Sequence, residues 1–391
     1  MIKDFIKEII KKIRDVLVSF RTGVYIGIEI LDKNKPRCLL ITNGMGFGGA
    51  PLVLMEAAYA YKKLGYNVVI CTEYYGNLIK LCRKNGIFVW IVPKGSAWLK
   101  NFIIKVQFSF ALVNTVVQYE WISTLNKNGI PVLWWLHEGD SYIQLMKNVL
   151  PKNIPTSVNV LTVSKRTQKS LEDNGFKYKT EMMHYGLKDL KVGESKKYIN
   201  NIDNEDYRIL VMGAICKRKN QLFALQAYRK LDLQLQKKIK LLFVGEPLDE
   251  YDAYYIEFME NINKENGIEY IPRVDRDRIP QLYDEIDALI CCSIDDPLPV
   301  VVTECLMFSK TVIISSETGQ YPLIQNGKNG FSFVSEDIDD LCEKIKNAYN
   351  ARNDIKLAEN ARLVYENYFT KEIFQNNLQN YTKKLEERKK K

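Results

Sequence analysis

Two acidic residues, Asp296 and Glu304, bracket an abrupt turn in the 391-residue sequence and could bind a polar ligand. Between them, Pro297 and Pro299 favour extended backbone that leads directly into a helix. The first amides of a helix lack intrahelical acceptors, and the helix dipole favours negative charge beside them. This arrangement predicts a site for phosphate or sugar oxygens. The alternative is a helix capped by Asp296 with Glu304 exposed.

The elements around this turn would place both acids on one side of a sheet. Residues 286–292 form an apolar run typical of a buried strand, and residues 300–308 form an apolar segment typical of a buried helix. Glu304 would then lie roughly 7–8 Å along the helix, at ~1.5 Å per residue. Open α/β sheets bind ligands at the carboxyl ends of their strands, which is where both acids are expected.

A basic stretch follows the strand predicted at 208–212 and could bind phosphate. It contains Arg218 and Lys219, and Asn220-Gln221 begins the next helix. A diphosphate leaving group gains negative charge as its bond to a sugar breaks, and fixed cations stabilise that charge. Arginine can bind phosphate through two donors, whereas lysine acts as a point charge. The alternative is a solvated basic loop.

Two further motifs follow strands in the first half of the chain. A glycine-rich turn at 44–51 includes Gly48 and Gly49, and it could bring backbone close to a phosphate or could simply be a tight turn. His137 is one of two histidines and is followed by Glu138. Its place after the strand at 130–136 is compatible with ligand contact or with a structural role.

Strand and helix patterns alternate twice along the chain, which predicts two doubly wound parallel sheets. Residues 188–205 are polar and lack periodicity, so they are interpreted as a linker. The expected strands are 37–42, 67–72, 87–92, 108–114, 130–136 and 158–163 before the linker, and 208–212, 240–244, 268–271, 288–292 and 311–314 after it.

The two ends of the chain differ from this pattern. Residues 1–21 have the spacing of an amphipathic helix with six basic and three acidic side chains, and 22–36 resemble a connector. Such a helix can lie on an anionic membrane, or it can pack on the protein itself or on a second subunit. Residues 336–391 are expected to be helical.

Composition narrows the class of protein. The net charge of +9 is compatible with nucleic acid or membrane binding, but no nucleic-acid-binding motif is present. Apolar runs are shorter than a membrane span, no signal peptide pattern precedes them, and the eight cysteines suit a reducing compartment, so a cytoplasmic protein is expected. Asp275-Arg276-Asp277 could bind a metal, but its place before a helix favours a helix cap.

The string from Ser293 to Phe308 resembles the acidic signature of the retaining glycosyltransferases of family 4, in a subgroup containing Asp-Pro-Leu-Pro. The resemblance implies that Glu304 holds the nucleotide ribose and that Asp296 lies beside the donor sugar. It assigns donor binding to Leu298, Pro299 and Val300. It also assigns donor contacts to Gly48, Gly49, Arg218 and Lys219, and a catalytic role near the sugar to His137. Many members have arginine where this sequence has Ala214.

The resemblance implies a GT-B architecture, in which two Rossmann-like domains face each other across a cleft. The expected divisions are 1–36, an N-terminal acceptor domain at 37–187, a nucleotide-sugar domain at 188–365, and a helix at 366–391 packed on the first domain. The implied reaction is metal-independent transfer of a sugar from a nucleotide diphosphate sugar to a hydroxyl, with retention and without a further cofactor. A glycan or lipid-linked acceptor in bacterial cell-surface polysaccharide or glycolipid assembly is expected.

Two other functions are compatible with the same architecture. A catalytically silent adaptor that stabilises a partner glycosyltransferase would explain Ala214 and the lack of the family's usual glutamate after Gly319. A non-hydrolysing sugar-nucleotide epimerase would need more acid and base groups than this histidine-poor chain contains. The expected location is cytoplasmic, with the inner face of the plasma membrane as a peripheral site.

Overall fold

The computed structural model describes residues 31–46, 48–191, 206–262 and 267–390. The chain divides into two compact units, with crossings at Leu187 and Thr370, so that the first unit combines the N-terminal half with the last helix. The second crossing lies at Thr370 rather than at the expected 365, because the helix before it continues to Tyr368 and the buried Phe369 follows. The predicted helix at 1–21 lies outside the described residues.

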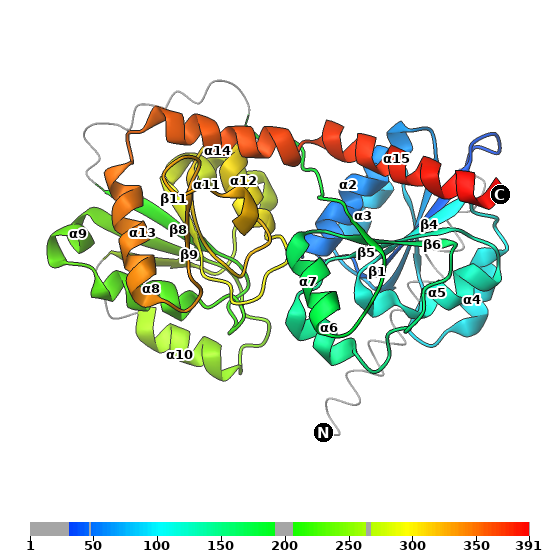
Figure 1. Cartoon of the computed structure of the whole chain (residues 1–391), viewed down its shortest axis with the longest axis horizontal. Helices are drawn as coiled ribbons and strands as arrows, with labels where there is room; N and C mark the ends of the chain where they lie inside the picture. Colours follow the sequence, from blue (N-terminus) through cyan, green and yellow to red (C-terminus); the bar gives the residue numbers. More distant parts are fainter. Residues whose placement is uncertain (1–30, 47, 192–205, 263–266, 391) are drawn as a thin grey trace. The chain divides into compact units, whose positions relative to one another are not determined.

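The first unit is built on a parallel sheet of order β3-β2-β1-β4-β5-β6-β7 (Figure 1). All of its strands except the edge strand β7 are nearly continuous buried apolar runs, as expected for a sheet covered on both faces. The strands are β1 (Arg37–Gly44), β2 (Asn67–Tyr74), β3 (Phe88–Ile91), β4 (Phe110–Asn114), β5 (Val132–Leu136), β6 (Val158–Thr162) and β7 (Thr180–Met182).

Helices cover both faces of this sheet. One face carries α4 (Ala97–Ile104), α5 (Glu120–Lys127), α6 (Asp140–Met146) and α7 (Lys165–Asp173). The other carries α2 (Gly49–Lys63), α3 (Leu78–Lys84) and the last helix, α15 (Lys371–Lys390). The helix α15 is held there by a hydrogen bond of 3.1 Å between Tyr61 and Thr382, and by ring packing of Trp135 on Phe374.

The second unit has a parallel sheet of order β10-β9-β8-β11-β12-β13. Its strands are β8 (Tyr207–Met212), β9 (Ile239–Val244), β10 (Ile268–Ile271), β11 (Ala288–Cys291), β12 (Thr311–Ser315) and β13 (Phe331–Phe333). The helices are α8 (Gln221–Lys230), α9 (Leu233–Lys238), α10 (Ala253–Ile262), α11 (Ile279–Glu285), α12 (Val300–Met307), α13 (Ile338–Asn350) and α14 (Ile355–Tyr368).

The described structure confirms the fold class predicted from the sequence, two parallel Rossmann-like sheets. Two strands were not predicted, β7 and β13, and both are only three residues long. The helix α2 begins at Gly49, inside the stretch 44–51 that was predicted to be a glycine-rich turn, because Pro51 is compatible with the first turn of a helix. The structural differences therefore concern short edge elements and element ends.

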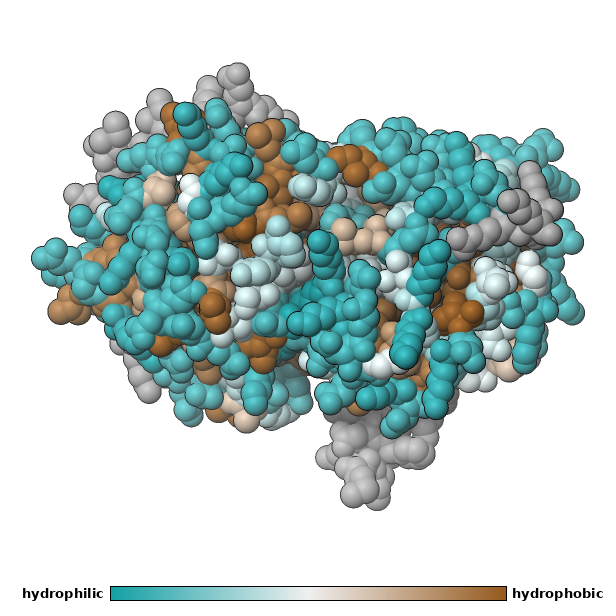
Figure 2. Space-filling view, in the orientation of Figure 1, coloured by the Kyte–Doolittle hydropathy of each residue, from teal (hydrophilic) through white to brown (hydrophobic). Residues whose placement is uncertain are grey.

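No helix in the described ranges is both long and apolar enough to cross a membrane. The face of the molecule in Figure 2 is mostly hydrophilic, with hydrophobic residues in scattered patches. All eight cysteines are free, and seven of them are buried in the two cores. The exception is Cys216, which is half-buried in the loop after β8.

Candidate active site

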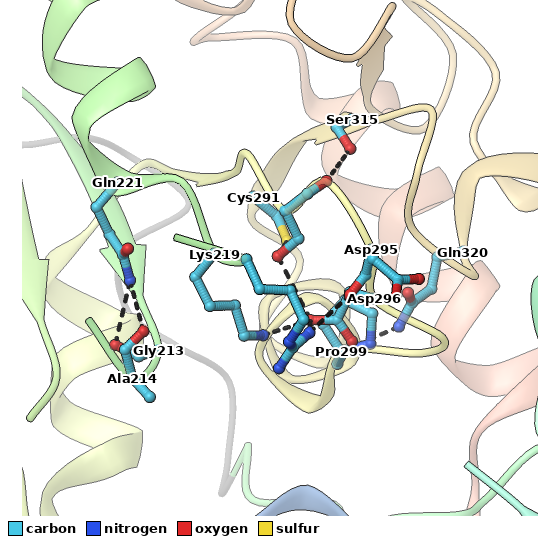
Figure 3. A network of polar contacts seen from close by, with 12 residues as sticks. Gly213, Ala214, Lys219, Gln221, Cys291, Asp295, Asp296, Pro299, Ser315 and Gln320 are labelled. Atoms are coloured by element: carbon cyan, nitrogen blue, oxygen red, sulfur yellow. Dashed lines mark hydrogen bonds and ion pairs between the residues drawn. The ribbon is translucent and has the colours of Figure 1, made fainter. Parts of the chain in front are cut away.

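Asp296 is the centre of a charged cluster at the carboxyl edge of the second sheet (Figure 3). Asp296 is only 6% exposed to solvent. Its carboxylate is in direct ionic contact with Lys219 and lies 3.4 Å from Nη1 of Arg218. Burial alone would raise the pKa of Asp296, but the two cations outweigh burial and lower it below the ordinary value. Asp296 is therefore a fixed carboxylate with two basic neighbours.

The backbone around Asp296 is fixed by neighbouring loops. Its amide donates to the carbonyl of Glu317 at 3.0 Å, and its carbonyl accepts from the amide of Gly319 at 2.9 Å. Arg218 donates from Nη1 to the carbonyl of Asp295 at 2.7 Å. The loops after β8, β11 and β12 are thus tied together at one edge of the sheet, where open α/β folds bind ligands.

The loop that carries the two cations is shaped by glycine and by one buried amide. Gly213 and Gly245 have φ of +150° and +156°, and a Cβ on Gly245 would lie 1.8 Å from the carbonyl oxygen of Gly213. The side chain of Gln221 is almost fully buried and donates to the carbonyl of Ala214 at 2.8 Å. Ala214 therefore lies in a well-ordered turn, although it brings no charge of its own.

The start of α12 is open to hydrogen bonding. Pro299 is its N-cap residue and supplies no side-chain cap, so the amides of Val300 and Val301 have no intrahelical acceptor. Gln320, which is fully buried, donates to the carbonyl of Pro299 at 2.9 Å and to Thr303 Oγ1 at 3.2 Å. Leu298 and Pro299 are buried and Val300 is half-buried, so the backbone at this helix start is rigidly held.

Glu304 lies in a second cluster on the same helix. It is 1% exposed, with Oε1 2.5 Å from Nη1 of Arg276 and Oε2 3.2 Å from the hydroxyl of Tyr283. Burial, the largest influence, raises the pKa of Glu304, although Arg276 and Tyr283 act in the opposite direction. The alternative of an exposed Glu304 is wrong, because α11 and the turn before it cover the carboxylate.

Asp275 and Asp277, interpreted from the sequence as part of a helix cap and not as metal ligands, flank this arginine. Asp275 occupies the N-cap position of the short 3₁₀ turn Arg276–Arg278, as predicted, but its side chain makes no capping bond and instead lies 3.6 Å from Nε of Arg273. Among the described residues, no group of three or more histidine, cysteine, aspartate or glutamate side chains could hold a metal ion.

In the first unit, His137 and the glycine turn lie in loops after β5 and β1. His137 packs its ring against Trp135 at 4.2 Å, and its Nε2 is buried without a hydrogen-bond partner. Burial lowers the pKa of His137 to about 3, so the imidazole is neutral at physiological pH. Gly48 is the N-cap of α2 and Gly49 is its first residue, so both lie at an open helix start.

Glu138 supports the backbone beside His137. The carboxylate accepts the amide of His137 at 2.9 Å and is 8% exposed as a residue. Burial raises the pKa of Glu138 to about 7, although bonds from the backbone at Val116, His137 and Glu138 itself act against it. This glutamate is therefore a structural acid that titrates near neutral pH.

The raised pKa of Glu138 predicts a pH-dependent stability of the first unit. The folded state binds this proton more tightly than the unfolded state, so the free energy of unfolding falls as pH rises from the ordinary value of 4.5 to about 7. Relative to Glu138→Gln, wild type should lose roughly 2–3 kcal/mol over that range. All five tryptophans lie in this unit, so denaturation followed by tryptophan fluorescence measures it. Parallel pH curves for the two proteins would contradict this assignment.

The sequence missed the residues that support the site. Arg276, Tyr283 and Gln320 position Glu304 and the start of α12, but no motif marks them as functional. The sequence did hold one signal for Arg276, because this arginine is the central residue of the Asp275–Asp277 motif, which was interpreted as a helix cap. Asp296 and Glu304, both expected at the carboxyl ends of the strands, have separate cationic neighbours: Lys219 and Arg218 beside Asp296, and Arg276 beside Glu304.

The fold and the site define a class of protein. Two parallel Rossmann-like sheets, with a cationic loop and an acid-flanked helix start at one carboxyl edge, are the features of a GT-B glycosyltransferase. Residues 34–186 match the family model for glycosyl-transferase family 4, and residues 193–364 match that for glycosyl transferases group 1. The two matches together span most of the chain, which belongs to the family 4 glycosyltransferases.

Individual relatives agree with this assignment. An α-1,4-N-acetyl-D-galactosaminyltransferase of Campylobacter jejuni, which acts on an undecaprenol-linked saccharide according to its name, is 29% identical over 158 residues. That match covers 39% of this chain and 42% of the relative, so less than half of the relative's length is matched.

Two solved structures share the fold. HepE of Anabaena, in complex with UDP and glucose, superposes with a TM-score of 0.73 at 18% identity, covering 88% of this chain and 99% of HepE. WaaG, a glycosyltransferase involved in lipopolysaccharide biosynthesis, gives a TM-score of 0.65 at 14% identity, covering 87% of this chain and 99% of WaaG.

Proposed function

We propose that this protein transfers a sugar from a nucleotide diphosphate sugar to a hydroxyl group, with retention of anomeric configuration and without a bound metal. The observation that best supports this is the cluster of Lys219, Arg218 and Asp296 beside the open start of α12. Cations fixed at a helix start suit a diphosphate, and a neighbouring carboxylate suits sugar hydroxyls. Membership of the glycosyltransferase family supports the same reaction.

Each group of residues has a proposed role in that reaction. Lys219 and Arg218 stabilise the diphosphate as it leaves, and Glu304 accepts the ribose hydroxyls. The backbone of Leu298, Pro299 and Val300 binds sugar oxygens, and Asp296 orients the sugar.

In the first unit, Gly48 and Gly49 bring backbone toward the donor diphosphate and the acceptor. His137, neutral because of its burial, is proposed to use its unpaired Nε2 in a hydrogen bond to the transferred sugar.

The proposed transfer needs no protein nucleophile. The bond between the anomeric carbon and the phosphate oxygen breaks, and the acceptor oxygen bonds to the same face of that carbon. The acceptor proton moves to the leaving phosphate oxygen, whose charge the two cations have stabilised. Asp296, held as an anion by Lys219 and Arg218, contributes orientation and electrostatic stabilisation of the positive charge that develops on the sugar.

The named relatives favour a bacterial glycan acceptor. The Campylobacter relative acts on an undecaprenol diphosphate saccharide by its name, and WaaG belongs to lipopolysaccharide biosynthesis. HepE was crystallised with UDP and glucose, which makes UDP-sugars the first donors to test. We propose a glycan or lipid-linked acceptor in cell-surface polysaccharide or glycolipid assembly.

The test is a donor screen followed by product analysis. The full chain should be titrated calorimetrically with UDP, GDP and ADP and their sugar conjugates, in the presence of a chelator. Saturable binding of one nucleotide class, and transfer from a labelled donor with the anomeric configuration retained by NMR, support the proposal. A chain that binds none of these nucleotides, and only stabilises a partner enzyme, is the adaptor instead.

A second proposal concerns the residues that precede the first strand, β1. Residues 1–21, outside the described residues, carry six basic side chains against three acidic ones on a helical pattern with a wide apolar face. We expect the full chain to co-sediment with vesicles rich in anionic lipid, and less so at high salt, because such helices combine apolar burial with charge attraction. A chain beginning at Asn34 should remain in the supernatant and keep its donor affinity. Equal sedimentation, or unfolding of the shorter chain, would contradict the membrane proposal.

A further inference from the structure

Arg276 makes a contact that the proposed function does not yet use. It precedes α11 in the turn Arg276–Arg278, and its side chain is 38% exposed. From there it reaches Oε1 of Glu304 at 2.5 Å, while Tyr283 donates to Oε2 from the other side. One exposed cation thus covers a carboxylate that is otherwise enclosed by protein.

A buried carboxylate needs such a partner to remain an anion. Transfer of an unpaired charge into the interior is costly, and the group usually takes up a proton instead. Burial already raises the pKa of Glu304, and Arg276 is the larger of the two opposing influences. Without Arg276, the pKa of Glu304 would therefore be raised further, and its carboxylate would hold a proton more tightly.

A count of lone pairs leaves acceptor capacity on Glu304. An ionised carboxylate has about four lone-pair sites on its two oxygens. Arg276 uses a site on Oε1 and Tyr283 uses one on Oε2, with the same hydroxyl also 3.0 Å from the carbonyl of Val301. By this count each oxygen keeps one lone-pair site, enough for the two neighbouring hydroxyls of a ribose, and the exposed Arg276 is the group that lies beside the buried Oε1.

We propose that Arg276 is a positioning residue, which holds the carboxylate of Glu304 as a fixed acceptor for the ribose hydroxyls of a nucleoside diphosphate. This inference rests on the proposed function, since it concerns the nucleotide that the second unit binds. It assigns a role to the central residue of the Asp275–Asp277 motif, whose flanking acids are both exposed. The motif acts through its arginine and not through its carboxylates.

The titratable groups that face Glu304 determine which of them could cause a pH dependence of nucleotide binding. Among the described residues they are Arg276 from the turn, Tyr283 from α11 and the thiol of Cys305 on the same helix. Burial raises the pKa of both Tyr283 and Cys305, so neither loses its proton in the neutral range. A nucleotide-binding transition that moves when Arg276 is changed therefore reports on Glu304.

The test compares nucleoside diphosphate affinity in Arg276→Gln and wild type between about pH 6 and about pH 9. In the variant the proton stays on Glu304 to higher pH, and affinity is lost as pH falls through that raised pKa. We expect binding at least ~10-fold weaker near neutral pH and recovery toward wild type near pH 9. Arg276→Lys, which keeps the charge, should bind within about threefold of wild type at all pH values.

Arg278→Gln is the matched control, because Arg278 is an exposed arginine of the same turn. It should leave the affinity unchanged, which separates the contact with Glu304 from the loss of one positive charge. Arg276→Gln binding as tightly as wild type, or more tightly, would overturn the proposal, because Arg276 would then be neutral or a competitor for Glu304. A loss of affinity that is the same at every pH would overturn it too.

If wild type binds no nucleoside diphosphate, the proposed function itself fails. If wild type binds and only Glu304→Gln weakens binding, the role of Arg276 alone fails.

Discussion

Glu304→Gln is expected to weaken nucleoside diphosphate binding by at least ~2–3 kcal/mol, which is about 30-fold to 150-fold, with a matching loss of activity. The neutral amide replaces one acceptor oxygen with a donor, so it cannot accept two ribose hydroxyls as the carboxylate does. The same change removes the charge that Arg276 contacts at 2.5 Å. Calorimetric titration and initial rates measure the two effects.

The fold should tolerate this substitution. Glutamine has almost the same volume and can still accept the bond from Tyr283, and the exposed Arg276 can turn toward water. Thermal unfolding close to that of wild type would confirm this. Asp277→Asn is the matched control, since it removes one exposed acid from the same region and should change neither binding nor activity. Activity of Glu304→Gln within a factor of about two of wild type would refute the assignment to the ribose.

Much of the fold could be predicted because its signals are local. Most strands of both sheets are buried apolar runs, although β7 and β10 are only partly buried, and each predicted strand is separated from the next by a helical period or by turn residues. The strands β7 and β13 gave no such signal, since each has three residues and obtains its place by pairing with β6 or β12. Pairing at a sheet edge depends on residues far away in the sequence, which a local pattern does not contain.

The same distinction between local and distant signals applies to the residues of the site. Asp296, Lys219 and Glu304 each lie in a stretch where a strand is followed by a turn and then a helix. That order along the chain already indicates the carboxyl edge of a sheet. Their partners could not be predicted in this way. Arg276 reaches Glu304 from the turn before α11, and Gln320 reaches Pro299 from the loop after β12. These contacts join segments that are adjacent only after the sheet has formed.

Lys219→Ala is expected to lower turnover about 100-fold and to weaken nucleoside diphosphate binding at the same time. Loss of one preorganised group that stabilises developing charge typically costs 10²–10³-fold in rate. Lys219 is mostly buried and in contact with Asp296, whereas Arg218 is 3.4 Å away and more exposed, so Arg218 should compensate only in part. The neighbouring Lys217 is exposed, and Lys217→Ala is the control. A chelator should change neither parameter, and strict dependence on added divalent metal would instead implicate Asp275 and Asp277.

Lys219 has two separable effects, since it neutralises the buried Asp296 and is proposed to stabilise the diphosphate. Burial raises the pKa of Asp296, and Lys219 lowers it more than Arg218 does. Lys219→Ala alone therefore raises the pKa of Asp296 and also removes the proposed contact with the phosphate. The double variant Lys219→Ala with Asp296→Asn removes the uncompensated acid. If Lys219 acts on the diphosphate, nucleoside diphosphate affinity should stay low in the double variant. Recovery of that affinity to the level of Asp296→Asn alone would show that Lys219 only neutralises Asp296, and the leaving-group assignment would be wrong.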